Sequence, residues 1–149
     1  MPLQPGQKAP DFRIKNQNGE EKTLADYAGK KLVLYFYPKD DTPGCTTQSC
    51  NLRDNYANLL KQVYQVVGVS VDDEKSHRKF IEKFNLPFDL LADTEKQMVQ
   101  DYGVWGEKSM YGRKFMGIFR TTFVIDESGV IEEIIGKVDT AKHTAQILK

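Results

Sequence analysis

Hydrophobic residues fall along the chain in short runs of two kinds. Residues 32–37 are continuously apolar or aromatic and are followed by Pro38, which predicts a strand buried on both faces. Residues 63–71 form a second candidate of this kind. Between the two runs, apolar positions recur at helical spacing over residues 45–61, which predicts a helix. This strand–helix–strand unit is expected to form a right-handed crossover.

The rest of the chain continues the alternation of strands and helices. The remaining predicted elements are a strand at 9–14, a helix at 76–84, a strand at 90–92, a helix at 94–102, paired strands at 121–125 and 130–135, and a helix at 140–148. Together they predict one α/β domain over residues 1–149, with a central mixed β-sheet flanked by helices on both faces. Residues 37–45 then lie beyond the carboxyl end of a central strand, where open sheets usually carry their sites.

Composition and charge narrow the function classes. The chain has 149 residues, 40% hydrophobic and 28% charged, and 21 basic residues balance 21 acidic ones. Because there is no basic excess and no long apolar run, we expect neither a nucleic acid nor a membrane as partner. The opening residues lack a basic stretch followed by an apolar one, so we expect no secretory signal and a cytoplasmic protein. A leader that has already been removed is left open.

The chain contains only two cysteines, Cys45 and Cys50. A secreted disulfide scaffold needs more, and two close thiols in an intracellular protein indicate redox or metal chemistry. The spacing C-x-x-x-x-C is not typical of zinc sites, which disfavours a metal site formed with a histidine. His77 and His143 are expected at the surface.

Cys45 lies in the first turn of the predicted helix, directly after Pro43 and Gly44. Free N–H groups and the positive end of the helix dipole favour a thiolate there. A lower pKa also makes a thiolate a weaker nucleophile, so ionisation alone raises reactivity only about a few-fold. A fast reaction therefore needs donors that stabilise the transition state. Candidates are the Thr42 hydroxyl, the N–H groups of Gly44 and Cys45, and an arginine from elsewhere.

At these positions the chain resembles a known family. Pro38, Thr42 and Cys45 form the P-x-x-x-T-x-x-C motif of the peroxiredoxins. With Cys50 added, the sequence resembles the Q-type subfamily, also called bacterioferritin comigratory protein. Further similar segments are 5–12, 115–118 and 120–126, and the likeness covers essentially the whole chain. The resemblance implies a thioredoxin-like fold.

The resemblance also implies roles for individual residues. Cys45 would be the peroxidatic nucleophile and Cys50 the resolving cysteine of an intramolecular disulfide. Thr42 and Arg120 would bind the peroxide, and Pro38 would shield the site from water. The implied substrates are hydrogen peroxide and organic hydroperoxides, and the implied reductant is thioredoxin or a glutaredoxin-like dithiol. No metal, haem or other cofactor is implied, and a monomer is favoured.

The spacing of the two cysteines predicts a conformational change. Positions five apart on an α-helix have Cα atoms about 8.7 Å apart, whereas a disulfide needs about 4.4–6.8 Å. We therefore expect residues 45–52 to unwind once Cys45 is a sulfenic acid. Four weak helix formers lower the cost of this unwinding: Thr46, Thr47, Ser49 and Asn51.

Each residue also has a purely structural interpretation. Cys45 could be a core thiol, Cys50 a spare one, Arg120 a surface ion-pair partner, Thr42 a turn residue and Pro38 a strand stop. Two rival functions remain: a dithiol–disulfide exchanger, which normally needs C-x-x-C, and a non-enzymatic redox sensor or chaperone.

Two further segments also receive an interpretation. Residues 72–74 are read as the acidic first turn of a helix. The apolar side chains within residues 105–119 are read mainly as core, with Trp105 or Phe119 as alternative walls of a peroxide pocket or a partner surface.

Overall fold

The computed structural model describes residues 3–148 of the chain. The first two residues and Lys149 lie outside the described residues, so the predicted domain is followed from Leu3 to Leu148. Within that range, no helix is both long enough and apolar enough to cross a membrane.

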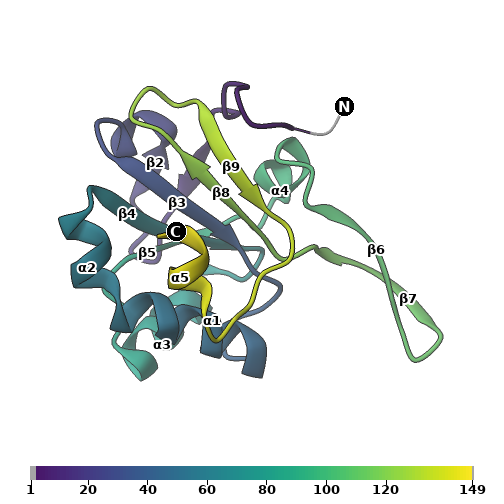
Figure 1. Cartoon of the computed structure of the whole chain (residues 1–149). Coiled ribbons are helices and arrows are strands. Elements are labelled where there is room, and N and C mark those ends of the chain that lie inside the picture. The colour runs from purple at the N-terminus through teal and green to yellow at the C-terminus, as the bar shows by residue number, and fades with distance from the viewer. Residues whose placement is uncertain (1–2, 149) are drawn as a thin grey trace.

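A five-stranded mixed sheet forms the centre of the molecule (Figure 1). Its strands, in spatial order, are β5 (Asp89–Ala92), β4 (Tyr64–Ser70), β3 (Lys31–Phe36), β8 (Thr121–Ile125) and β9 (Ile131–Ile135). β3 pairs in parallel with β4 and antiparallel with β8. Its residues from Leu32 to Phe36 are at most 1% exposed, as expected for an unbroken apolar run that occupies the middle of a sheet.

Helices cover both faces of this sheet, which confirms the predicted fold class. One face carries α1 (Pro43–Asp54), α2 (Tyr56–Lys61), α3 (Glu74–Phe84) and α5 (His143–Ile147), packed on Val33 and Tyr35. The other face carries the 3-10 helix η1 (Leu24–Tyr27) and α4 (Gln97–Asp101), packed on Leu34 and Phe36. Alternate side chains of β3 therefore enter opposite cores, as the two-residue period of a strand requires.

The N-terminal segment differs from its prediction. The predicted strand at 9–14 is shortened to β1 (Arg13–Lys15), which pairs with β2 (Glu21–Thr23). The turn between them contains Gly19 with a φ of 78°, a conformation that glycine adopts at little cost. Ala9 and Phe12 are buried in the core instead of forming strand pairs, and Lys8 makes only an isolated bridge to Val130.

The helix predicted at 45–61 begins earlier and is divided in two. It begins at Pro43, and Asn55 separates α1 from α2. The Asn55 side chain donates a hydrogen bond to the Asn51 carbonyl at 2.8 Å, so it competes with the backbone for that acceptor. The helices predicted at 94–102 and 140–148 are shorter than expected. Lys96, at φ 60°, precedes α4, and α5 begins only after Lys142.

The segment that was read mainly as core forms a hairpin that projects from the body (Figure 1). Its strands are β6 (Trp105–Met110) and β7 (Arg113–Ile118), which pair only with each other. Ile118 is buried and Trp105 is partly buried against the core, in agreement with the prediction. The prediction is wrong for the others, because Tyr111 is 98% exposed and four further apolar side chains are also exposed: Met110, Phe115, Met116 and Phe119. The ribbon turns at Tyr111 and Gly112, both at positive φ, and leaves the sheet.

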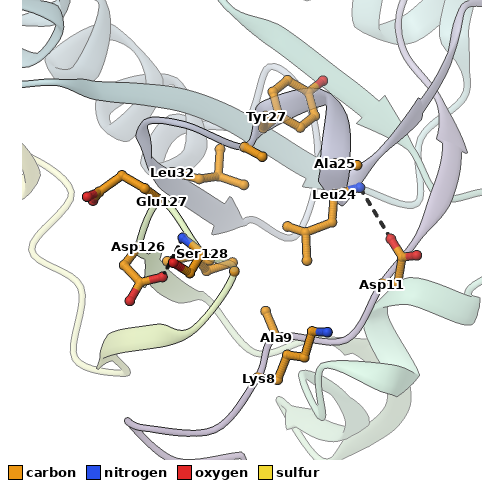
Figure 2. A pocket seen from close by; sticks show the side chains of 13 residues that line it. Lys8, Ala9, Asp11, Leu24, Ala25, Tyr27, Leu32, Asp126, Glu127 and Ser128 are labelled. Atoms are coloured by element: carbon orange, nitrogen blue, oxygen red, sulfur yellow. Dashed lines mark hydrogen bonds between the residues drawn. The ribbon is translucent and has the colours of Figure 1, made fainter.

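A pocket of about 480 Å³ lies among the N-terminal loop, η1 and the turn between β8 and β9. Figure 2 shows Leu24 and Leu32 beside it, with the carboxylates of Asp11, Asp126 and Glu127 around its edge. None of its lining residues is a cysteine, histidine or arginine. It therefore offers no group suited to thiol redox chemistry.

Candidate active site

The loop after β3 leads directly into α1 and determines where Cys45 lies. Asp41 adopts a φ of 55°, and Thr42 is the N-cap residue with Pro43 following it in the first turn. The Thr42 hydroxyl does not cap the helix but donates to the Lys39 carbonyl at 2.8 Å. Cys45 is the third residue of a helix of 12 residues, so it lies in the first turn. Free N–H groups of that turn are therefore available beside its sulfur.

Arg120 reaches Cys45 from the neighbouring part of the sheet. It directly precedes β8, and its Nη2 donates to the Cys45 Sγ at 3.2 Å across a sequence separation of 75 positions. Cys45 itself is only 1% exposed. A Cβ on Gly44 would lie 3.2 Å from Arg120 Nη2, so the glycine leaves room for the guanidinium. The structure thus brings together Arg120 and Cys45, the arginine and the cysteine that the resemblance to the peroxiredoxins singled out.

Gln48 holds the other side of the same guanidinium. Its Oε1 accepts a hydrogen bond from Arg120 Nη1 at 2.6 Å, and the residue is fully buried. Its Nε2 is one of two buried side-chain atoms without a hydrogen-bond partner among residues 3–148. No role for Gln48 was predicted from the sequence. Its spacing of three residues from Cys45, which places both on one helix face, was the available signal.

Lys108 of the projecting hairpin brings a second cation toward the site. Its Nζ donates to the Ile118 carbonyl at 2.8 Å and lies 5.9 Å from the centre of the Phe119 ring. Burial lowers the pKa of Lys108, the charge of Arg120 lowers it further, and Cys45 opposes this. Nothing in the sequence pattern pointed to Lys108, because its position depends on how the hairpin pairs.

Two further residues that the sequence singled out, Pro38 and Phe119, flank the segments that carry Cys45 and Arg120 in the chain. Pro38 is half-buried and follows Tyr37, whose N–H donates to the Val69 carbonyl. The Phe119 ring packs over Gly106 at the base of the hairpin and is 45% exposed. Their roles as a water shield and a pocket wall remain predictions.

Cys50 lies on the same helix in a different setting. Both cysteines are free thiols, and Cys50 is only partly buried. Burial raises the pKa of Cys50, a rise that Asp54 increases and Arg53 opposes. Because α1 is continuous from Pro43 to Asp54, the Cα atoms of the two cysteines are held at the helical separation of about 8.7 Å.

The C-terminal half of α1 is anchored to the body. Ser49 Oγ and Tyr35 Oη are hydrogen-bonded at 2.9 Å in the core. Asn51 donates to the Ala141 carbonyl and accepts from both the N–H and the hydroxyl of Thr144, at 2.8–2.9 Å. These bonds mean that Ser49 and Asn51, chosen from the sequence as weak helix formers, stabilise their half of the helix.

The prediction that both histidines lie at the surface is wrong, since each is fully buried. The His143 ring is hydrogen-bonded to Thr122 Oγ1 and Gln146 Oε1, both at 2.8 Å. Burial lowers the pKa of His143, and the charge of Arg120 lowers it further, whereas the Gln146 bond opposes this. Thr122 comes from β8 and is not evident from the local sequence, whereas Gln146 lies three residues after His143 on α5.

The acidic run at 72–74 is only partly a helix start. Asp73 is the N-cap of α3 and accepts from the Ser76 N–H at 2.8 Å, and Glu74 begins the helix. Asp72 points elsewhere and accepts from the Asp40 N–H and the Ser70 hydroxyl.

As for metals, no group of three or more His, Cys, Asp or Glu side chains that could hold an ion occurs between Leu3 and Leu148.

Fold and site together define a class of protein. A cysteine in the first turn of the helix after a central strand, with an arginine on its sulfur, is the arrangement of a thiol-based redox enzyme. The model of the AhpC/TSA family matches residues 5–134. Peroxiredoxin Bcp of Bacillus subtilis is 45% identical over 149 residues, which cover 100% of this chain and 95% of that protein. The peroxiredoxin Bcp of Escherichia coli is 43% identical over 147 residues, covering 99% and 94%.

Solved structures agree with these relatives. A mutant of Xylella fastidiosa PrxQ superposes with a TM-score of 0.92 at 32% identity, covering 99% of this chain and 94% of that one. The bacterioferritin comigratory protein of Xanthomonas campestris gives a TM-score of 0.89 at 34% identity, covering 97% and 95%. The chain belongs to the AhpC/TSA family and, within it, to the Bcp or Q-type peroxiredoxins. It is therefore a thiol peroxidase with a thioredoxin-like fold, acting on peroxides with a thiol reductant.

Proposed function

We propose that this chain is an atypical two-cysteine peroxiredoxin in which Cys45 attacks the peroxide and Cys50 resolves the oxidised form. The observation that carries the proposal is the hydrogen bond from Arg120 to the Cys45 Sγ in the first turn of α1. An arginine on the sulfur holds it in position and remains in place for the charge that develops as the peroxide splits.

In the first step, the Cys45 thiolate attacks one peroxide oxygen. A sulfur–oxygen bond forms, the O–O bond breaks, and the departing alkoxide takes up a proton and leaves as an alcohol or water. Cys45 becomes a sulfenic acid. Arg120 and the free N–H groups of Gly44 and Cys45 are the donors for the oxygen that gains charge. Because the Thr42 hydroxyl already donates to Lys39, its oxygen serves the peroxide O–H as an acceptor.

In the second step, the Cys50 thiolate attacks the Cys45 sulfur. A disulfide forms, and the sulfenic oxygen leaves as water after taking up a proton. Since the intact helix holds the two Cα atoms about 8.7 Å apart, the first turns of α1 must unwind. The bonds of Asn51 to α5 and the full burial of Leu52 support a narrower segment than the predicted 45–52, one that ends before Asn51.

The remaining expectations concern partners. We propose thioredoxin or a glutaredoxin-like dithiol as reductant, since an intramolecular disulfide is the product to be reduced. Hydrogen peroxide and organic hydroperoxides are the proposed substrates. The Xanthomonas campestris relative supports the second class, because its structures address alkyl peroxide reduction. A cytoplasmic monomer that binds neither nucleic acid nor membranes completes the proposal.

A single-turnover comparison of Cys45→Ser and Cys50→Ser tests the proposal. Cys45→Ser is expected to abolish peroxide consumption. Cys50→Ser is expected to consume about one peroxide per chain without external thiol and then stop, because its sulfenic acid has no partner. Equal activity of Cys45→Ser and wild type would overturn the assignment. Disulfide exchange without peroxide would favour the exchanger, and slow turnover in excess reductant would favour the sensor.

A further inference from the structure

A buried carboxylate, Asp40, lies in the loop between β3 and α1 and takes no direct part in the chemistry above. The residue is 7% exposed. Its Oδ1 accepts a hydrogen bond from the Tyr37 hydroxyl, and its Oδ2 accepts from Ser76 Oγ at 2.8 Å. Its backbone N–H donates to Asp72 Oδ2 at 2.8 Å. Asp40 is thus fixed from its own loop, from α3 and from the segment before α3.

His77 completes this network from α3 and is fully buried. Its Nδ1 lies 2.7 Å from Asp40 Oδ2, and its Nε2 lies 2.9 Å from the Leu91 carbonyl oxygen. A carbonyl oxygen can only accept, so Nε2 carries a hydrogen. Nδ1 shares a hydrogen bond with Asp40 Oδ2, the same carboxylate oxygen that accepts from Ser76 Oγ. Both ring nitrogens of His77 are therefore held in place, one by Asp40 and the other by the Leu91 carbonyl.

The network connects to the peroxide site through a short backbone path. Lys39 and Asp41 flank Asp40, and Asp41 holds a φ of 55°. The Lys39 carbonyl accepts the Thr42 hydroxyl at 2.8 Å, and the Thr42 carbonyl accepts the Thr46 N–H at 2.8 Å. Fixing Asp40 therefore fixes the direction of the Lys39 carbonyl, which in turn orients the Thr42 oxygen. None of Asp40, Ser76 and His77 has a recorded hydrogen bond to Cys45 or Arg120.

We propose that His77 and Asp40 are positioning residues for peroxide reduction, which set the Thr42 hydroxyl at the start of α1. The proposal rests on the proposed function, because it concerns the first step at Cys45. A network that only stabilised the fold would lower stability when broken but leave the selectivity of Cys45 unchanged. A positioning network also changes how well Cys45 reacts with a peroxide relative to a reagent that needs no peroxide site.

Two substitutions of His77 separate its two hydrogen bonds. The Nδ2 of an asparagine occupies the place of Nδ1 and keeps the bond to Asp40, whereas the Nε2 of a glutamine occupies the place of Nε2 and keeps the bond to Leu91. His77→Asn is expected to retain the second-order rate constant with hydrogen peroxide within about threefold, and His77→Gln to lower it about tenfold. Asp40→Asn, which replaces one of the two accepting carboxylate oxygens by an NH2 group, is expected to lower it by about 10–100-fold.

The same proteins are alkylated at Cys45 with iodoacetamide, in a Cys50→Ser background. The ratio of the peroxide rate to the alkylation rate is expected to fall in His77→Gln and Asp40→Asn but not in His77→Asn. Should the His77 variants fail to fold, Ser76→Ala removes one donor from Asp40 on a partly exposed residue and is measured in the same way.

The outcomes separate this inference from the proposed function. If the variants lose thermal stability but keep the ratio of the Cys50→Ser parent, the network is structural and the positioning role is overturned. If the parent protein itself shows no peroxide-dependent oxidation of Cys45, the proposed function fails instead. A lowered ratio in His77→Asn equal to that in His77→Gln would also contradict the route through Asp40.

Discussion

The two cysteines of α1 are chemically identical side chains on one helix, yet their surroundings differ at every point. Cys45 is almost completely buried, lies in the first turn and accepts a hydrogen bond from Arg120. Cys50 is more exposed, lies mid-helix, and burial raises its pKa. Burial alone therefore does not account for the difference between the two thiols. What sets Cys45 apart is the hydrogen bond that the Arg120 guanidinium donates to its sulfur.

The two halves of the helix differ in the same way. The N-terminal half connects to Arg120 through Cys45 and Gln48, so its contacts lead to the site proposed for the reaction. The C-terminal half connects to β3 and α5 through Ser49 and Asn51, so its contacts hold the helix in place. The boundary lies close to Cys50, in agreement with the proposal that the helix opens at its N-terminal end.

The largest expected effect comes from removing Arg120, the arginine beside Cys45. Removing Arg53, the arginine that acts on Cys50, is expected to have little effect. Arg120→Met is expected to lower the peroxide rate constant by about 100–1,000-fold, the typical loss for one donor to a developing negative charge. Arg53→Met is the matched control, because Arg53 is the cation that acts on Cys50. It is expected to leave the first oxidation step within about twofold. Stopped-flow fluorescence or competition for peroxide measures both.

An equal loss of the peroxide rate constant in both variants would mean that positive charge near α1 in general, and not the hydrogen bond from Arg120 to Cys45, speeds the reaction. Thermal denaturation of each variant shows whether the fold is intact.

A smaller effect is expected when the arginine is displaced without being removed. A Cβ at position 44 would lie 3.2 Å from Arg120 Nη2 and 3.9 Å from its Cζ. Gly44→Ala is therefore expected to shift the guanidinium by a few tenths of an ångström and slow peroxide reduction about tenfold. Gly136→Ala, where nothing lies within 4 Å of the new Cβ, is the control. A Gly44→Ala enzyme as fast as Gly136→Ala would show that Arg120 tolerates the displacement.

Much of the fold, and the motif residues, followed from local patterns. The run at 32–37 predicted β3, and the signals around Cys45 placed it in a first helical turn, because both depend on neighbouring residues. Gln48 and Lys108 were missed because their relation to Arg120 exists only after α1, β8 and the hairpin come together. Each is therefore a consequence of tertiary pairing.

For the apolar hairpin and the two histidines, the burial of the side chains was predicted wrongly. A hydrophobic run predicts burial, but residues 105–118 pair only with themselves and leave Tyr111 in solvent. The histidines were expected to be exposed, but His77 and His143 are buried because oxygen atoms satisfy both ring nitrogens of each. Three of these four oxygens come from other elements, and the fourth, Gln146 Oε1, lies on α5 with His143. The polarity of a residue indicates how much free energy its burial costs. It does not indicate which hydrogen-bond partners offset that cost in the folded protein.

The anchor in the C-terminal half of α1 gives a third prediction. Asn51→Ala removes the bonds to α5 and is expected to lower the free energy of unfolding by about 1–3 kcal/mol, since the Thr144 N–H loses its acceptor. The Cys45–Cys50 disulfide is still expected to form at the wild-type rate after peroxide addition, because Asn51 lies outside the segment proposed to unwind. Asn58→Ala, on an exposed position of α2, is the control. Faster disulfide formation in Asn51→Ala than in Asn58→Ala would show that the unwinding extends to Asn51.

The smallest expected effect is the pH dependence of the free energy of unfolding. It arises at His143, which lies close enough to Arg120 to be affected by its charge. The folded-state pKa of His143 lies below its ordinary value of 6.5, chiefly through burial, and the Arg120 charge contributes. The unfolded chain then binds a proton more readily, so this contribution to stability is fully present above about pH 6.5 and is lost as pH falls below it. Urea unfolding at pH 5, 6, 7 and 8 is expected to show a steeper loss for wild type than for His143→Gln. The guanidinium of Arg120 that acts on His143 is the same one that donates to the Cys45 sulfur, so His143 lies on the Cys45 side of the comparison. Identical pH slopes for the two proteins would mean that the His143 ring is not held neutral by its place beside Thr122.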